Sequence, residues 1–179
     1  FSLKGVRGSI SAILRNREGQ TWIGTEDGVL AQFVEPDSLV YFSRTGDAVT
    51  SMVEDREGSL WVGRHASGLH RLKKGTFTTY AEADGLPSDF VQVVCPDRDG
   101  SVWIAGTGGL SRFSGNSLTA YVSPDGTPLE GIMALHSASD GTLWIGNSYG
   151  LSILKGGKVR SLITSRGAPQ RAVREIDED

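Results

Sequence analysis

The stretch Asp97-Arg98-Asp99-Gly100-Ser101-Val102-Trp103-Ile104-Ala105 occurs four times in the chain with small changes, and the other copies surround Trp22, Trp61 and Trp144. In each copy a glycine that follows an acidic residue stands three positions before the tryptophan. An Asp-Gly or Glu-Gly pair supplies the positive φ that tight hairpin turns require. The following run of β-branched and aromatic residues is typical of a half-buried strand. Each copy therefore predicts a hairpin turn that leads into a strand.

The spacing of the tryptophans predicts the architecture. They are separated by 39, 42 and 41 residues along the chain. A period near 40 with several short strands per unit is typical of a propeller blade, and no segment has the apolar spacing of a long helix. The sequence predicts an all-β fold, a β-propeller built from four-stranded antiparallel blades, in which each tryptophan packs between adjacent blades.

The repeat boundaries follow from the same alignment. We expect one partial propeller domain over residues 1–179, with complete repeats at about 9–43, 48–81, 90–122 and 131–163. Aligning Gly167 to Val173 with Gly85 to Val91 places residues 172–179 on the first strand of a fifth repeat. Four complete blades leave two blade faces uncovered. Uncovered apolar faces and strand edges favour association, so we expect self-association or coverage by the remainder of a parent propeller.

Composition excludes several classes of partner. The net charge is −3, from 18 basic and 21 acidic residues that are not segregated, which gives no footprint for nucleic acid or an anionic membrane. Cys95 is the single cysteine, so an internal disulfide framework is excluded. The sequence has no signal peptide and no apolar run of membrane-spanning length, so we expect no membrane contact by this segment. The chain begins with Phe1 and is expected to be a piece of a longer protein.

One further pattern resembles a known family. Gly85-Leu86-Pro87, then Asp97-Arg98-Asp99-Gly100 with Trp103-Ile104, then Gly109-Leu110-Ser111-Arg112-Phe113 is similar to the two-component regulator propeller repeat. The resemblance implies a seven-bladed sensor module, the periplasmic or extracytoplasmic part of a signal-transduction receptor with a histidine kinase or cyclase-type output domain. It therefore implies a non-enzymatic module that binds a small molecule, a carbohydrate or a partner domain.

Loops that connect the blades are the expected recognition surface, because propeller loops vary while the blades hold them. These loops lie between the fourth strand of one repeat and the first of the next, and between the second and third strands of each repeat. The candidate ligand-binding residues on them are Asp47, His65, Asp84, Asp125, Tyr149 and Arg166. Tyr149 aligns with the smaller Gly108, Ser67 and Asp27, and an aromatic ring there could stack on a ligand ring.

No catalytic residue, metal site or cofactor is predicted. Asp97-Arg98-Asp99-Gly100 lacks the further ligands of a calcium loop and indicates a hairpin turn. His70 is expected to be solvent-exposed, and His136 to lie on a first strand near the propeller axis. The alternatives are a propeller lyase or lactonase of the streptogramin-lyase type, which would use His136, and a general protein-interaction propeller of the WD-repeat class.

Overall fold

The computed structural model describes residues 8–34, 38–122, 126, 129–162 and 172–178. These residues form four separate four-stranded antiparallel sheets, each made from four consecutive strands. The first two blades contain β1 (Ile10–Arg15), β2 (Thr21–Thr25), β3 (Val29–Val34), β4 (Ser38–Arg44), β5 (Val49–Glu54), β6 (Leu60–Arg64), β7 (Leu69–Lys73) and β8 (Thr76–Tyr80). The other two contain β9 (Val91–Pro96), β10 (Val102–Gly106), β11 (Gly109–Ser114), β12 (Ser117–Tyr121), β13 (Ile132–Ser137), β14 (Leu143–Asn147), β15 (Gly150–Lys155) and β16 (Lys158–Ser161).

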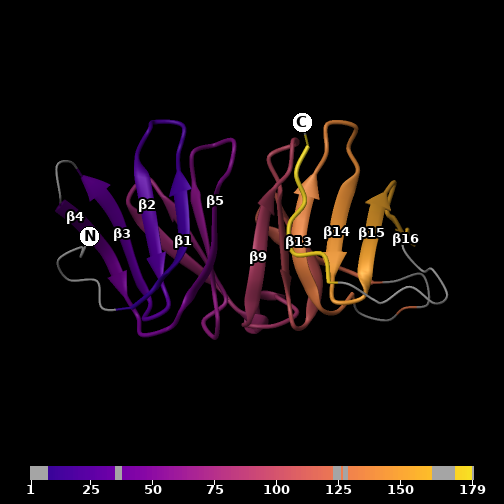
Figure 1. The fold of residues 1–179 in the computed structure, drawn as a ribbon, viewed down its shortest axis with the longest axis horizontal. Coiled ribbons are helices and arrows are strands. Elements are labelled where there is room, and N and C mark those ends of the chain that lie inside the picture. Colours follow the sequence, from indigo (N-terminus) through magenta and orange to yellow (C-terminus); the bar gives the residue numbers. More distant parts are fainter. Residues whose placement is uncertain (1–7, 35–37, 123–125, 127–128, 163–171, 179) are drawn as a thin grey trace.

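The four sheets stand side by side as consecutive blades 1 to 4 of a propeller (Figure 1). The first strand of each blade contacts the first strand of the next, β1 with β5, β5 with β9 and β9 with β13. These strands therefore line the inner edge of the fan, and β4 and β16 lie at its outer ends (Figure 1). The hairpins between first and second strands all emerge at one edge, the hairpin face, which is uppermost in Figure 1. The connections between blades and the loops between second and third strands lie at the opposite edge, the loop face.

The all-β propeller prediction is confirmed, and the observed strands agree with the expected ones to within one or two residues. One difference is a turn of 3-10 helix at Glu82–Asp84 in the connection between β8 and β9. The Asp84 carboxylate accepts the N–H of Ala81 at 2.9 Å, and Gly85 ends the turn with φ of 102°. In the part of the chain that the structure describes, no helix has the length and apolarity that a membrane crossing needs.

The core lies between the blades, as the strand position of the tryptophans predicts. Trp22 of blade 1 clusters with Leu60, Val62 and Leu72 of blade 2. The same arrangement places Trp61 against blade 3 and Trp103 against blade 4. Trp144 of blade 4 is only partly buried. Trp22, Trp61 and Trp103 thus each pack on the blade that follows in sequence, with about 200 Å² of ring surface buried apiece.

A small residue two positions after each tryptophan lets the next blade approach closely. A Cβ added at Gly24 would lie 2.4 Å from Cγ1 of Val49, and one at Gly63 would lie 2.8 Å from Cγ1 of Val91. Blade 3 has Ala105 at this position, fully buried. The first residue of each following inner strand therefore docks into the preceding blade.

Residues 172–178 contain no regular strand in the structure, whereas the repeat alignment predicts one. They nevertheless lie against blade 4. Val173 N–H donates to the carbonyl of Asn147 at 3.1 Å, and its side chain approaches Gly146 as Val91 approaches Gly63. The Glu178 carboxylate accepts the N–H of Ser139 at 3.0 Å. Without a second strand beside it, this segment has no partner with which to form a ladder among the described residues, so its assignment to a fifth repeat stays a prediction.

Candidate functional site

The loop face brings Asp47 and His65 into one cluster between blades 1 and 2. Asp47 lies in the connection from β4 to β5, and its Oδ2 accepts the Ser67 hydroxyl at 2.6 Å and the Ala66 N–H at 3.1 Å. The carboxylate therefore fixes the loop between β6 and β7. His65 lies in that loop and is exposed, and its backbone N–H donates to the carbonyl of Ala48 at 3.1 Å.

The His65 ring meets the Phe90 ring edge to face, with centroids 4.7 Å apart. Phe90 comes from the connection between β8 and β9, the same connection that carries Asp84. Asp84 is exposed, and its carboxylate closes the 3-10 turn by accepting the Ala81 N–H. The imidazole of His65 is thus available at the surface, whereas Asp84 already has a structural partner.

Tyr149 stands in the loop between β14 and β15 with 61% of its surface exposed. Its backbone N–H donates to Oδ1 of Asn147 at 2.8 Å, which fixes the loop while the ring stays in solvent. Asp125 and Arg166, the other two predicted contact residues, lie outside the described residues.

Arg64 is the residue of the loop face that sequence reasoning missed. It ends β6, and only 1% of its surface is exposed. Nη1 donates to the carbonyl of Asp47 at 2.7 Å and to the Thr45 hydroxyl at 2.8 Å, and Nη2 donates to the Ser43 hydroxyl at 2.8 Å. Burial lowers the pKa of this guanidinium, and the nearby Asp47 charge opposes that shift. The equivalent residues in the other blades are Thr25, Gly106 and Asn147. The only sequence signal for Arg64 is therefore that blade 2 has a long charged residue where the other blades have smaller uncharged ones.

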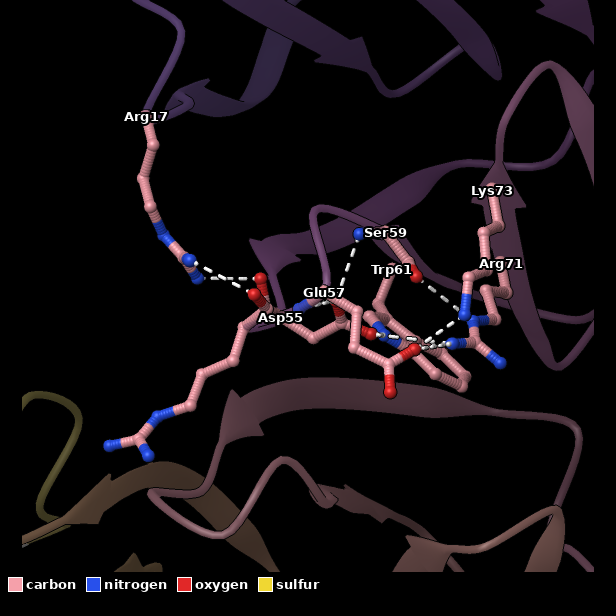
Figure 2. A network of polar contacts seen from close by, with 8 residues as sticks. Arg17, Asp55, Glu57, Ser59, Trp61, Arg71 and Lys73 are labelled. Carbon is pink, nitrogen blue, oxygen red and sulfur yellow. Dashed lines mark hydrogen bonds and ion pairs between the residues drawn. The ribbon is translucent and has the colours of Figure 1, made fainter.

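A polar network organises the hairpin face of blade 2 (Figure 2). Asp55 is 2% exposed, and its Oδ1 accepts the backbone N–H groups of Glu57 and Ser59 at 2.9 and 2.8 Å. Its Oδ2 accepts the indole N–H of Trp61 at 2.7 Å. The Arg71 guanidinium lies 4.9 Å from the centre of the Trp61 ring and 3.6 Å from the Asp55 carboxylate.

Blade 3 repeats this arrangement. The indole N–H of Trp103 donates to Oδ2 of Asp97 at 2.9 Å, and the Arg112 guanidinium lies 4.9 Å from the ring centre. Burial alone would raise the pKa of Asp97, but hydrogen bonds from Ser137, the Arg98 N–H and Trp103 outweigh it and leave that pKa lowered. The Ser137 hydroxyl comes from blade 4 and donates to Oδ1 of Asp97 at 2.7 Å, so the network also joins two blades.

The remaining titratable candidates give no metal site among the described residues, where no three His, Cys, Asp or Glu side chains are grouped to hold an ion. The prediction that His70 is exposed is wrong: it is half-buried, because its ring lies beside the Ser67 carbonyl at 3.2 Å, and burial lowers its pKa. Burial likewise raises the pKa of the Cys95 thiol to about 11. His136 lies on β13 with its Nε2 3.5 Å from the Glu178 carboxylate.

Two clefts lie away from the predicted loop surface. One of about 290 Å³ opens on the hairpin face between blades 1 and 2 and is lined by Asn16, Glu18, Gln20, Trp22, Gln32, Phe42, Glu54, Gly58, Leu60, Leu72, Lys74 and Gly75. The other, about 500 Å³, lies between the uncovered face of blade 4 and residues 173–178, beside Trp144 and His136. No sequence motif predicts the first cleft, because it forms where blade 1 has shorter side chains than the equivalent positions of blades 2 and 3.

The model of the two component regulator propeller family matches residues 43–63 and 85–108. These two segments are two-component regulator propeller repeats. Each matched segment runs from a connection between blades, through the inner strand and its hairpin, to the strand that holds Trp61 or Trp103. A comparison of the sequence with curated proteins finds no match.

Solved structures with the same fold include several functional classes. Virginiamycin B lyase from Staphylococcus aureus is 15% identical with a TM-score of 0.77, and the match covers 92% of this chain and 59% of the lyase. The extracellular domain of a hybrid two component system from B. thetaiotaomicron is 18% identical with a TM-score of 0.52, over 84% of this chain and 29% of that one. The WD40 propeller domain of Doa1 is 15% identical with a TM-score of 0.73, over 99% and 60%. The chain therefore shares its fold with lyase, sensor and WD40 propellers and spans about 59% of the lyase's length.

Proposed function

We propose that the chain is a non-enzymatic recognition module, part of the extracytoplasmic sensor region of a signal-transduction receptor. The observation that carries the proposal is the match of two segments to the two component regulator propeller family. An extracellular sensor domain of a two component system has the same fold. The ligand would be a small molecule or a carbohydrate, or a partner domain would take its place.

The loop face supports this role because its exposed rings are held by a fixed frame. Arg64 and Asp47 bind the loops of blades 1 and 2 together, with three hydrogen bonds of 2.6 to 2.8 Å in the cluster. The His65 ring and the Tyr149 ring are left at the surface. Exposed aromatic and imidazole rings on a rigid frame suit the stacking and hydrogen bonding of a ring-shaped ligand.

Thermal shift measurements with a panel of monosaccharides and disaccharides test the proposal. We expect at least one sugar to raise the melting temperature of the chain, because a ligand that binds only the folded state stabilises it. The His65→Ala and Tyr149→Ala variants should lose that rise, and Lys155→Ala on the hairpin face should keep it. A panel without any rise, or a rise that both loop variants retain, would contradict recognition of sugars at the loop face.

A second candidate is lyase activity, favoured by the pairing of His136 with Glu178 beside a cleft of about 500 Å³. An imidazole next to a carboxylate is a general acid–base arrangement. Incubation with virginiamycin B, followed by mass spectrometry, tests it with the His136→Ala variant as control. Turnover by the parent chain that His136→Ala abolishes would replace the sensor proposal.

We also propose that the two outer blade faces are covered in the working protein, by a second copy or by further chain. Ile13 on blade 1 is 66% exposed, whereas its counterparts Met52 and Val94 are 8% and 4% exposed in the interfaces between blades. This difference in exposure supports an interface of the same kind at the outer face of blade 1.

A further inference from the structure

The cleft on the hairpin face can be compared with the same place in the next two blades, because the fold repeats. In blade 2 the Arg71 guanidinium lies over the Trp61 ring, and its Nη2 is 3.3 Å from the Glu57 carboxylate. In blade 3 the Arg112 guanidinium lies over Trp103, with Nη2 2.5 Å from Asp99. Both interfaces are therefore filled by a planar cation between an indole and an acidic side chain.

Blade 1 keeps the indole and the acid but has no arginine at the position opposite the indole. The strand pairing places Gln32 opposite Trp22, as it places Arg71 opposite Trp61 and Arg112 opposite Trp103. The hairpin alignment places Glu18 where blades 2 and 3 have Glu57 and Asp99. Glutamine is shorter than arginine and does not reach the space that the guanidinium fills in blades 2 and 3. In blade 1 this space is part of the cleft of about 290 Å³.

The Trp22 indole N–H is a second sign that this cleft is unfilled. Asn16 replaces the aspartate that accepts the indole N–H in blades 2 and 3. Its Oδ1 accepts the Gln20 N–H at 2.8 Å, and its Nδ2 is a donor that bonds Oε1 of Gln20 at 2.8 Å. Among the described residues, neither the Trp22 indole N–H nor the Gln32 amide has a hydrogen-bond partner, although Trp22 is only 6% exposed. This donor is therefore free to bond a ligand oxygen in place of water.

Glu18 and an aromatic wall favour a cation at the cleft. Glu18, Glu54 and Lys74 all line it, and Glu54 is already paired with Arg17 at 3.6 Å, so Glu18 is the carboxylate left for a ligand. Trp22 and Phe42 form an aromatic wall with ring centroids 4.6 Å apart. Aromatic rings beside carboxylates attract guanidinium and ammonium groups, and guanidinium is the better match to a flat ring and a carboxylate together.

We propose that this cleft binds an arginine residue, free or within a peptide. Its guanidinium occupies the position that Arg71 and Arg112 fill in the neighbouring blades, between Trp22 and Glu18, and a carboxylate or carbonyl oxygen of the ligand faces the indole N–H. The cleft is on the hairpin face, opposite the loop face of the proposed function, so the two proposals stand or fall separately.

Titration of the ¹⁵N-labelled chain with L-arginine, followed by NMR of the four tryptophan indole N–H signals, tests the proposal. We expect a saturable shift of the Trp22 signal with a dissociation constant of about 1 mM or tighter, while L-citrulline, the uncharged analogue, binds at least about tenfold more weakly. Failure of the Trp22 signal to move saturably below about 50 mM L-arginine, or equal binding of citrulline, would overturn it.

Two variants and a matched control complete the test. Gln32→Arg supplies the cleft with the chain's own guanidinium, so L-arginine binding should be lost while the other indole signals keep their folded positions. Glu18→Gln should weaken binding about tenfold, and Glu57→Gln, the same change in blade 2, should leave it unaltered. Undiminished binding by folded Gln32→Arg would place the ligand elsewhere and contradict the proposed site.

Discussion

The indole N–H of Trp61 donates to the buried carboxylate of Asp55 at 2.7 Å. The same carboxylate accepts the backbone N–H groups of Glu57 and Ser59, so one side chain holds both the hairpin turn and the ring that packs on the next blade. Trp103 and Asp97 repeat this relationship in blade 3 at 2.9 Å. The acid before the turn is therefore a packing residue as well as a turn residue.

Asp55→Ala should lower the free energy of unfolding by about 3–5 kcal/mol, because it removes a buried carboxylate that faces Arg71 and leaves three N–H groups without their acceptor. Urea denaturation checks this value. Asp140→Ala, on the hairpin of blade 4, is the control and should cost much less, because Asp140 is exposed and has no bond to the tryptophan of its blade. Equal losses in the two variants would show that the buried network of blade 2 has no special role.

Acid should destabilise the chain below about pH 4. The pKa values of Asp97 and Asp99 are lowered in the fold, since their hydrogen bonds and the Arg112 charge outweigh the opposing effect of burial. The pKa of Asp140 falls to about 2 through its hydrogen bonds with Lys155 and Thr142. A lowered folded pKa contributes stability above the unfolded value, near 4, and that stability is lost as pH falls through the folded pKa.

Melting temperatures between pH 7 and pH 2.5 measure this effect. We expect little change down to about pH 5 and a fall below about pH 4. Asp97→Asn should flatten part of that fall. A melting temperature that holds or rises on acidification below pH 4 would mean that these carboxylates are not stabilised in the folded state.

Arg64→Ala should cost about 2–4 kcal/mol, because the carbonyl of Asp47 and the hydroxyls of Ser43 and Thr45 lose their donor inside the fold. Arg64→Lys should recover little of this loss, since one ammonium cannot reach the partners on both sides of the guanidinium. Denaturant melts of the two variants give the comparison. A lysine variant as stable as the parent would show that the charge alone is required.

Self-association should follow from the exposed outer faces. Sedimentation velocity at increasing concentration should show species larger than a 19.1 kDa monomer, because exposed apolar blade faces favour association. Ile13→Glu should shift the distribution toward monomer. A monomer at all concentrations would indicate that these faces are stable in water without a partner.

The repeat made the fold predictable, since the turn glycine, the tryptophan and the strand alternation each recur at one position. Trp22, Trp61 and Trp103 pack on the following blade as their fixed strand position predicts. The turn at Glu82–Asp84 was not predictable, because three polar residues carry no helical periodicity and the turn depends on the Asp84 carboxylate.

The sites were less accessible to sequence reasoning, because they depend on departures from the repeat. Asp47 looked like a free contact residue, but its carboxylate is bonded to Ser67 and Ala66. The cleft beside Trp22 depends on Asn16 and Gln32, two polar residues that form no motif. Their importance follows from the structure, in which the equivalent residues of blades 2 and 3 form the ion pairs Asp55 with Arg71 and Asp97 with Arg112.

The stability of Trp103→Ala relative to Trp144→Ala tests most directly whether each tryptophan joins its blade to the next one. Trp103 is 5% exposed and packs on blade 4, whereas Trp144 is partly exposed and lines a cleft together with residues 173–178. We expect urea denaturation to show a loss of about 3–5 kcal/mol for Trp103→Ala and clearly less for Trp144→Ala. Equal losses, or a loss below about 1 kcal/mol for Trp103→Ala, would contradict the packing of consecutive blades described above.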